Sequence, residues 1–557
     1  MAVFTQFELD ADLPLLQQCQ SIIHRIDVIL SELEQLKAAI ERRPASGHKP
    51  QSWNQAVPGL GFFERLIVSE RKHLEKMVAS YNDDSQEPKD LDSMVRLRLD
   101  ASNYKFYETV WEITKRCSDL AGMRRDLPYR TTSLGRSASA VVDLVVNGGA
   151  DWIKVVTTTP RRLAYEMADA GWEWDDDFTD DDALELLRDE DDDSIEVARV
   201  ARHMLAAARA SYTDYRRPRV RILMSRVGEG DSEPVDRLLR LVRRMSEGSG
   251  VSLVVETANG RQDGLLTAPT PPLAEAVANL VDTDYFKDFT ATLNVDCSVF
   301  MALASDFSHM EIGPESELLR SKQHQIDATD EFENGPRLAN TLYPALVGRD
   351  LVCTREAADT FLKIARGIGT DTERARTSII FDPADAHTTP EEDRIKRIAA
   401  LQDLSTHPVP PDLRLPVAIV DSISWNDAQR MVDAGALPAA ALAAGRKGSG
   451  LNAMNVSSFL YGWSAGLTTV TSNWEAAKRL RTVVETNRVT GDEVGPHIWR
   501  IPFSRKLLAK PKAADAAPGS WRLKTRQERQ VEKDASLQSW VAEKGRPVED
   551  GSLVDTQ

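Results

Sequence analysis

The stretch Leu293-Asn-Val-Asp-Cys-Ser-Val-Phe300 has the pattern of a short buried β-strand that ends at Asp296 and leads at once into a helix. A second strand of this kind, Asp350-Leu-Val-Cys-Thr354, is also followed directly by a helical pattern. Strands that alternate with helices are typical of a parallel, doubly wound sheet. The sequence therefore predicts an α/β domain over residues 288–510.

Two further folded regions are expected before this domain. Apolar residues recur at three- and four-residue steps over residues 14–43, which predicts an amphipathic helix. Farther on, two apolar stretches joined by Asn147-Gly-Gly149 indicate a β-hairpin, and residues 219–256 have the pattern of two parallel strands joined by a helix. We therefore expect a helical N-terminal region over residues 1–125 and a small α/β middle domain over residues 135–265.

Two segments lack a regular apolar pattern. Residues 383–416 are rich in proline and charge, and we expect them to form an irregular insertion within the C-terminal domain. Lysine, arginine, glutamate, glutamine and small residues dominate the end of the chain, so residues 513–557 are expected to be a disordered tail.

The composition indicates a soluble protein with several domains. A chain of 557 residues is too long for one hydrophobic core, and 42% of its residues are apolar. No apolar run approaches the roughly 20 residues that cross a bilayer, and residues 1–10 lack the pattern of a signal peptide. These features predict an intracellular protein, cytoplasmic or nuclear, with no membrane partner.

The net charge and the spacing of the cysteines limit which kinds of nucleic-acid, zinc and disulfide sites the chain can form. The formal net charge of −17 opposes non-specific binding of nucleic acid by the whole chain, so any RNA contact requires a local basic surface. The cysteines are widely spaced and form neither a zinc-binding pattern nor a disulfide framework. We expect Cys19, Cys117, Cys297 and Cys353 to be buried thiols.

Two acids fall where open α/β sheets build their sites, near the carboxyl ends of strands. Asp296 ends the first strand of the C-terminal domain. Asp359 lies about one turn into the helix after the next strand, with Glu356 three residues earlier on the same helix face. Carboxylate oxygens bind Mg²⁺ or Mn²⁺, which can activate water and neutralise a leaving phosphate oxygen. Asp296, Asp359 and Glu356 are therefore candidate metal ligands.

These acids, together with a late segment from Met454-Asn455 to Thr471-Ser-Asn473, resemble the site of a PIN-type nuclease domain. The resemblance implies that four positions gather around one or two divalent ions: a first-strand Asp, an acid on the next strand-helix unit, an acid that opens a late helix, and the acid of a Thr-x-Asp turn. These positions correspond to Asp296, Asp359, Asn455 and Asn473. Two of the four acids are therefore replaced by neutral amides.

More broadly, the chain resembles a family of animal and fungal proteins whose domain of unknown function includes a PIN-like C-terminal module. The resemblance covers about residues 135–500, and the stretches that carry it are Ala140–Lys154, Leu293–Asp296, Leu351–Arg376 and Ala465–Asn473. It implies a PIN-like fold for the C-terminal domain and attaches no particular activity to it.

A group of cations lies beside the candidate site in the sequence. Its members are Lys363, Arg366, Arg374 and Arg376. They could face a phosphate, but no aromatic residue interleaves them as a single-strand binding surface requires. An exposed helix whose arginines pair with Asp371 and Glu373 is the simpler interpretation.

The sequence leaves three functions open. The first is a degenerate PIN-like domain, non-catalytic or weakly active, with an RNA-related or scaffolding role. The second is a Mg²⁺- or Mn²⁺-dependent ribonuclease, in which the ligands would be Asp296 and Asp359, helped by Glu356 or Glu311, with Asn455 and Asn473 as neutral ligands. The third is a protein-interaction module formed by the N-terminal helices. Each lost charge within ~4 Å removes several kcal/mol of attraction for a divalent ion, which favours the first function.

Overall fold

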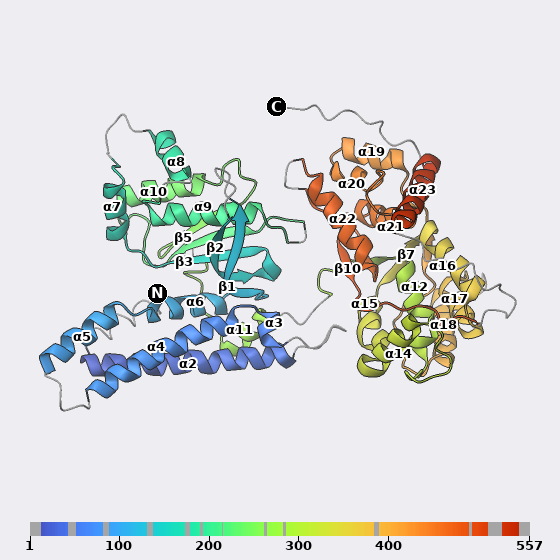
Figure 1. Ribbon diagram of the computed structural model, residues 1–557, viewed down its shortest axis with the longest axis horizontal. Coiled ribbons are helices and arrows are strands. Elements are labelled where there is room, and N and C mark those ends of the chain that lie inside the picture. Colours follow the sequence, from blue (N-terminus) through green and yellow to red (C-terminus); the bar gives the residue numbers. More distant parts are fainter. Residues whose placement is uncertain are drawn as a thin grey trace. The chain divides into compact units, whose positions relative to one another are not determined.

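The computed structural model of the protein describes residues 13–42, 52–81, 88–130, 137–172, 179–189, 193–213, 215–260, 264–281, 286–383, 389–489, 493–510 and 526–544 (Figure 1). The chain forms two compact units, the first from residues 1–44 and 50–283 and the second mainly from residues 284–557. Each unit combines helices with a five-stranded sheet. Among the described helices, none has both the length and the apolar character needed to span a bilayer.

The sheet of the first unit is mixed. Its strands are, in order across the sheet, β1 (Gly122–Arg130), β2 (Ser137–Val146), β3 (Asp151–Val156), β4 (Arg219–Met224) and β5 (Leu253–Thr257). The neighbours β1, β2 and β3 are antiparallel, whereas β3, β4 and β5 run parallel. Asn147 and Gly148 adopt φ angles of 53° and 64°, which let the chain reverse between β2 and β3. The predicted hairpin and strand-helix-strand unit are confirmed.

Helices cover both faces of this sheet. Residues along a strand alternate between its two sides, so each strand contributes side chains to a core on either face. Ile153 and Val155 belong to the core on one face, and Trp152 and Val156 to the core on the other. The helices of the first core are α2 (Leu15–Arg42), α3 (Trp53–Ala56), α4 (Leu60–Ser80), α5 (Pro88–Asp100), α6 (Tyr104–Lys115) and α11 (Leu273–Leu280). Those of the second core are α7 (Pro160–Asp169), α8 (Asp180–Arg188), α9 (Glu196–Arg209) and α10 (Glu233–Arg244). The unit is a three-layer sandwich.

The N-terminal helices are one layer of this unit and not a separate region. Leu33 of α2 and Trp111 of α6 are fully buried in the same core as Leu144 of β2 and Leu223 of β4. In addition, β1 begins at Gly122, inside the stretch expected to be helical. The expected boundary near residue 125 therefore crosses a single hydrophobic core, which local periodicity in the sequence does not report.

The sheet of the second unit is parallel throughout. Its strands are, in order across the sheet, β10 (Ile498–Arg500), β9 (Thr468–Thr471), β6 (Thr292–Val295), β7 (Asp350–Thr354) and β8 (Ala418–Val420). The chain begins at the central strand β6, adds β7 and β8 on one side, and then crosses to add β9 and β10 on the other. This is a doubly wound parallel sheet, as predicted.

Helices connect these strands. They are α12 (Cys297–Ala304), α13 (Asp306–His309), α14 (Lys322–Asn334), a π-helical turn at Leu338–Leu342, α15 (Tyr343–Leu346), α16 (Arg355–Ile368), α17 (Asp371–Phe381), α18 (Pro390–Asp403), α19 (Trp425–Asp433), α20 (Ala440–Ala443), α21 (Ala453–Ser464), α22 (Trp474–Thr486) and α23 (Arg526–Lys544). Phe300, Phe361 and Phe381 form an aromatic cluster with ring centroids 4.7, 5.5 and 5.8 Å apart. The cluster packs α12, α16 and α17 together.

A buried ionic cluster connects α17 to the end of α12. Arg376 is fully buried, and its guanidinium donates to a carboxylate oxygen of Asp306 at 2.7 Å and to the carbonyls of Ala304 and Leu404. Glu373 is also fully buried and accepts the backbone N–H of Asp306. The expectation that Arg376 and Glu373 pair on an exposed helix is therefore wrong. Their polar groups are satisfied by the interior, as buried charges must be.

The insertion predicted over residues 383–416 is not irregular throughout. Part of it forms α18, which begins with a capping box between Thr389 and Glu392 and has Pro390 in its first turn. Leu401 of this helix is buried in the core of the unit. The proline that argued against a helix is therefore one of the residues that starts it.

The expectation of disorder over residues 513–557 is wrong for residues 526–544, which form α23. Leu537, Trp540 and Val541 of this helix are buried. In Figure 1, α23 lies beside α19 and α21, and it packs against both. The other residues of the predicted tail lie outside the described part of the chain.

The prediction of buried thiols is confirmed, since all the cysteines are free and buried. Burial raises the pKa of Cys19 above its ordinary value. The same cause raises the pKa of Cys117, Cys297 and Cys353 to about 12. These thiols are therefore protonated and unreactive at neutral pH while the units stay folded.

We expect a fragment of residues 1–125 to lack a cooperative unfolding transition and a fragment of residues 1–283 to have one. The shorter fragment keeps the N-terminal helices but loses the sheet residues that complete their core. Thermal unfolding followed by circular dichroism distinguishes the two fragments. A sharp transition in the shorter fragment would show that the helices are an independent domain.

Candidate functional site

The edge of the second sheet at the ends of β6 and β9 brings together residues from distant parts of the chain. The order of strands reverses at this point, and open α/β sheets bind ligands in the crevice outside such strand ends. Asp296 follows β6 and Thr471 ends β9, and these strands are hydrogen-bonded neighbours. Topology therefore puts the candidate residues at a place suited to a site.

The Asp296 carboxylate is engaged inside the protein on both oxygens. Its Oδ1 accepts the backbone N–H of Ser298 at 2.9 Å and the hydroxyl of the same residue at 2.5 Å. Its Oδ2 accepts the hydroxyl of Thr471 at 2.5 Å. The contact with the Ser298 N–H makes Asp296 the N-cap of α12. The contact with Thr471 crosses from β6 to β9. With 1% of its surface exposed, Asp296 connects two strands and a helix.

Burial also sets the protonation of this carboxyl group. Loss of water disfavours the charged form and raises the pKa of Asp296 above its ordinary 3.8, although the hydrogen bonds from Ser298 and Thr471 act in the opposite direction. A metal ligand must be ionised and have an oxygen open to the ion, and burial opposes ionisation at Asp296.

Asn473 reaches the same edge and serves as the N-cap of α22. Its side-chain oxygen accepts the N–H of Ala476 at 3.1 Å. Its own N–H donates to the Thr471 hydroxyl at 2.9 Å, and the N–H of Ser472 donates to the Ser298 hydroxyl at 2.7 Å. Asn473 is therefore connected to Asp296 through Thr471.

Asn455 lies in the first turn of α21 and is buried. The hydroxyls of Ser457 and Ser458 lie 3.0 and 3.4 Å from that of Thr354 at the end of β7, so the start of α21 adjoins the same edge. Asn452, rather than Asn455, caps this helix by accepting the Asn455 N–H at 2.8 Å. Within the described residues, the side-chain nitrogen of Asn455 has no hydrogen-bond partner.

The remaining acids have other surroundings. Glu356 stands in the first turn of α16, where its Oε1 accepts the hydroxyl of Ser422 at 2.8 Å and the indole N–H of Trp540 at 2.9 Å. Asp359 is exposed one turn later on the same helix. Glu311 is exposed in the segment that follows α13.

Among the described residues, the acids of the candidate site do not gather into a metal-ligand group. No three Asp, Glu, His or Cys side chains in the described part of the chain lie close enough to hold a divalent metal ion. Asp296, Asp359 and Glu356 therefore belong to no ligand group, and Asp296 has both oxygens in internal hydrogen bonds. Mg²⁺ requires several available oxygens in near-octahedral geometry, which this arrangement does not supply.

The helix α23 packs beside this edge, which the sequence did not predict. Its Trp540 contacts Glu356 through the hydrogen bond above and meets the Trp425 ring edge to face, with centroids 6.4 Å apart. Nearer its start, Asp534 accepts the backbone N–H of Gly448 at 3.3 Å. The helix therefore crosses from α22 and the loop after α20 toward α16 and α19.

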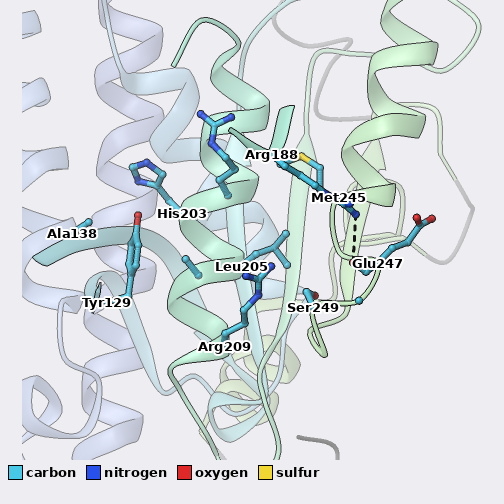
Figure 2. Close-up of a pocket in the computed structure, with 12 residues that line it drawn as sticks. Tyr129, Ala138, Arg188, His203, Leu205, Arg209, Met245, Glu247 and Ser249 are labelled. Atoms are coloured by element: carbon cyan, nitrogen blue, oxygen red, sulfur yellow. Dashed lines mark hydrogen bonds between the residues drawn. The ribbon is translucent and has the colours of Figure 1, made fainter. Parts of the chain in front are cut away.

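A pocket of about 490 Å³ lies in the first unit, and Figure 2 shows the side chains that line it. The side chains of two of its arginines cap the C-terminal ends of neighbouring helices. Arg188 donates to the carbonyl of Arg244 at 2.9 Å, and Arg202 donates to that of Leu187 at 2.8 Å. Much of the positive charge of this pocket is therefore engaged in hydrogen bonds to backbone carbonyls at the ends of the surrounding helices.

Tyr129 and His203 form one wall of this pocket, with ring centroids 6.0 Å apart (Figure 2). Burial lowers the pKa of His203 below its ordinary value, so the imidazole is neutral at pH 7. No local sequence pattern indicates this pocket, because its lining comes from separate helices and from β1 and β2.

We expect the free energy of unfolding of the wild type to fall, relative to that of Asp296→Asn, as pH rises above about 3.8. The raised pKa means that the folded state holds the proton more tightly than the unfolded chain, whose pKa is near 3.8. The stability that this carboxyl group contributes is complete at lower pH. It is lost as pH rises through the pKa of the group in the folded state. Urea unfolding of both proteins from about pH 4 to about pH 8 measures this difference. Parallel pH profiles would contradict it.

Comparisons of the chain with models of protein families, with curated proteins and with solved structures found no match.

Proposed function

We propose that the second unit is a PIN-like domain that does not cleave RNA, and that the protein has an RNA-related or scaffolding role based on binding. The observation that carries the proposal is the internal engagement of Asp296, the acid around which a metal centre at this edge would be built. A buried carboxyl group with a raised pKa, whose two oxygens both accept internal hydrogen bonds, offers a divalent ion little attraction.

Two further features support this proposal. The parallel sheet, with its central strand first and later strands added on either side, agrees with the fold implied by the resemblance. The two late positions are neutral amides, and Asn473 is occupied as a helix cap. A fold of this type that assembles no group of acidic, histidine or cysteine ligands within its described residues favours binding over hydrolysis.

The ribonuclease alternative requires a rearrangement of the same edge. Asp296 would have to release Ser298 or Thr471, and Asp359 would have to join it with Glu356 or Glu311 in support. Each such change breaks a buried hydrogen bond or moves a helix, and no contact among the described residues favours it.

A scaffolding role could also use the N-terminal helices, but only on their outer faces, since their inner faces pack on the sheet. Val28, Phe62 and Leu97 are exposed apolar residues on α2, α4 and α5. Among the described residues, these exposed side chains are the ones that such a role would use.

We expect the full-length protein to leave a single-stranded RNA intact in the presence of Mn²⁺, because no metal centre is assembled at the sheet edge. Gel analysis of a labelled oligouridine after incubation measures this. Asp296→Asn and Asp359→Asn serve as matched variants that remove one charge each. Metal-dependent cleavage by the wild type that disappears in folded Asp296→Asn would overturn the proposal.

We expect Asp296→Ala to lower the free energy of unfolding of the second unit, whereas Asp359→Ala leaves it nearly unchanged. Loss of the helix cap costs about 1 kcal/mol, and a Thr471 hydroxyl left without its acceptor costs about 1–3 kcal/mol more. Denaturant unfolding of both variants measures the difference. Equal stability of the two variants would show that the contacts of Asp296 contribute little.

A further inference from the structure

A groove of about 540 Å³ lies between α22 and the glycine-rich loop after α20. Its charged lining residues are Arg446, Lys447, Lys478 and Arg479, with Glu475 as the one acid. The whole chain carries a formal net charge of −17, so this surplus of positive charge is local. A local basic surface is what a polyanion needs in order to bind an otherwise acidic protein.

Three of these cations are available to a ligand. Arg446, Lys447 and Lys478 are exposed, and no ion pair joins any of them to another described residue. Arg479 has a different task, because it pairs with Glu475 at 2.8 Å and donates to the Gly450 carbonyl at 3.2 Å. Arg479 therefore holds the loop against α22, and the exposed cations around it face solvent.

An exposed aromatic ring lies on α22, the helix that forms one wall of the groove. Trp474 is 46% exposed and precedes Lys478 by four residues, which puts both on one face of α22. Its indole N–H donates to the Ile501 carbonyl at 3.0 Å, and the Arg500 guanidinium lies over its ring at 4.3 Å. The ring is thus fixed in position, with Arg500 over one face and Lys478 one turn further along α22. An exposed ring among cations is a surface on which bases stack in single-strand binding proteins.

The loop of the groove already receives one negatively charged group. The Asp534 carboxylate of α23 accepts the N–H of Gly448 at 3.3 Å. Gly448 and Gly450 adopt φ angles of 88° and 76°, a conformation that glycine permits at little cost. A backbone N–H of this loop therefore already donates to a carboxylate, and Asp534 adds a negative charge beside the groove.

We infer that single-stranded nucleic acid binds this surface, which we call the α22 surface and define by Arg446, Lys447, Trp474, Lys478 and Arg500. Phosphates contact the cations of the groove, and a base stacks on the exposed part of Trp474. A duplex hides its base faces and gains nothing from this ring. The inference rests on the proposed function in that the domain binds its ligand without cutting it.

The test uses the full-length protein and two fluorescein-labelled probes, an oligouridine and an oligothymidine of about 20 nucleotides, a length that spans a typical single-strand site. Fluorescence anisotropy in EDTA gives the dissociation constants. We expect binding that weakens about 20-fold between about 50 and about 200 mM salt, as three phosphate contacts predict. Binding of either probe supports the inference, and an oligodeoxyuridine of the same length shows whether a difference between the two comes from the sugar or from the methyl group of thymine.

Variants locate the site. Lys447→Glu with Lys478→Glu should weaken binding by about tenfold or more, and Trp474→Leu by about fivefold or more. Lys363→Glu with Arg366→Glu makes the same change of charge on α16, where both side chains are exposed, and should leave the affinity within about twofold of wild type. Asp534→Asn should tighten binding, because it removes a negative charge from the groove.

Absence of binding by the folded wild type, or equal loss of affinity in the α16 control, would overturn the inference. So would competition by polyglutamate together with an unchanged affinity in Trp474→Leu, which would assign the groove to acidic peptides. Circular dichroism of each variant verifies that it is folded. Cleavage of the oligouridine when Mn²⁺ replaces EDTA would contradict the proposed function and leave the location of binding intact.

Discussion

One buried carboxyl group organises the reversal point of the second sheet. Asp296 ends β6, caps α12 through Ser298 and accepts the Thr471 hydroxyl at the end of β9. In the low dielectric of the interior these hydrogen bonds are strong, and each donor would be costly to leave without a partner. A single side chain therefore joins the central strand, its following helix and the strand across the reversal point, and it adds to the backbone pairing of β6 with β9.

This arrangement has a direct bearing on chemistry. The oxygens that stabilise the sheet edge are the same oxygens that a metal ion at this position would need. A second anchor on the opposite end of α12, the Asp306–Arg376 pair, is equally consumed by internal contacts. These two buried groups thus hold helices in place.

Local sequence patterns predicted much of the fold. The apolar strands at Leu293–Asp296 and Asp350–Thr354 and the hairpin around Asn147 follow from residue periodicity and turn chemistry, which depend on neighbours in the chain. The three-residue strand β10 is too short to give a periodic signal, and the buried face of α23 was hidden in a stretch of largely polar composition. The union of the N-terminal helices with the sheet depends on contacts far apart in sequence, which no local pattern contains.

For the candidate site, the sequence predicted which residues lie close together better than it predicted their hydrogen bonds. The order of strand and turn correctly put Asp296 and Asn473 near one another, linked by Thr471. What each oxygen contacts was not predictable, because a serine two residues away can equally point elsewhere. The contact of Glu356 with Trp540, 184 residues later, lies beyond any argument from spacing.

The buried cysteines give this protein a set of natural reporters. Cys19 and Cys117 lie in the first unit, and Cys297 and Cys353 lie in the second. A thiol reagent modifies such a group only when its surroundings open and the thiolate can form. The alkylation rate of each cysteine can be measured in the intact chain from the masses of its peptides. These rates therefore record how often each unit opens, without any substitution or truncation of the chain.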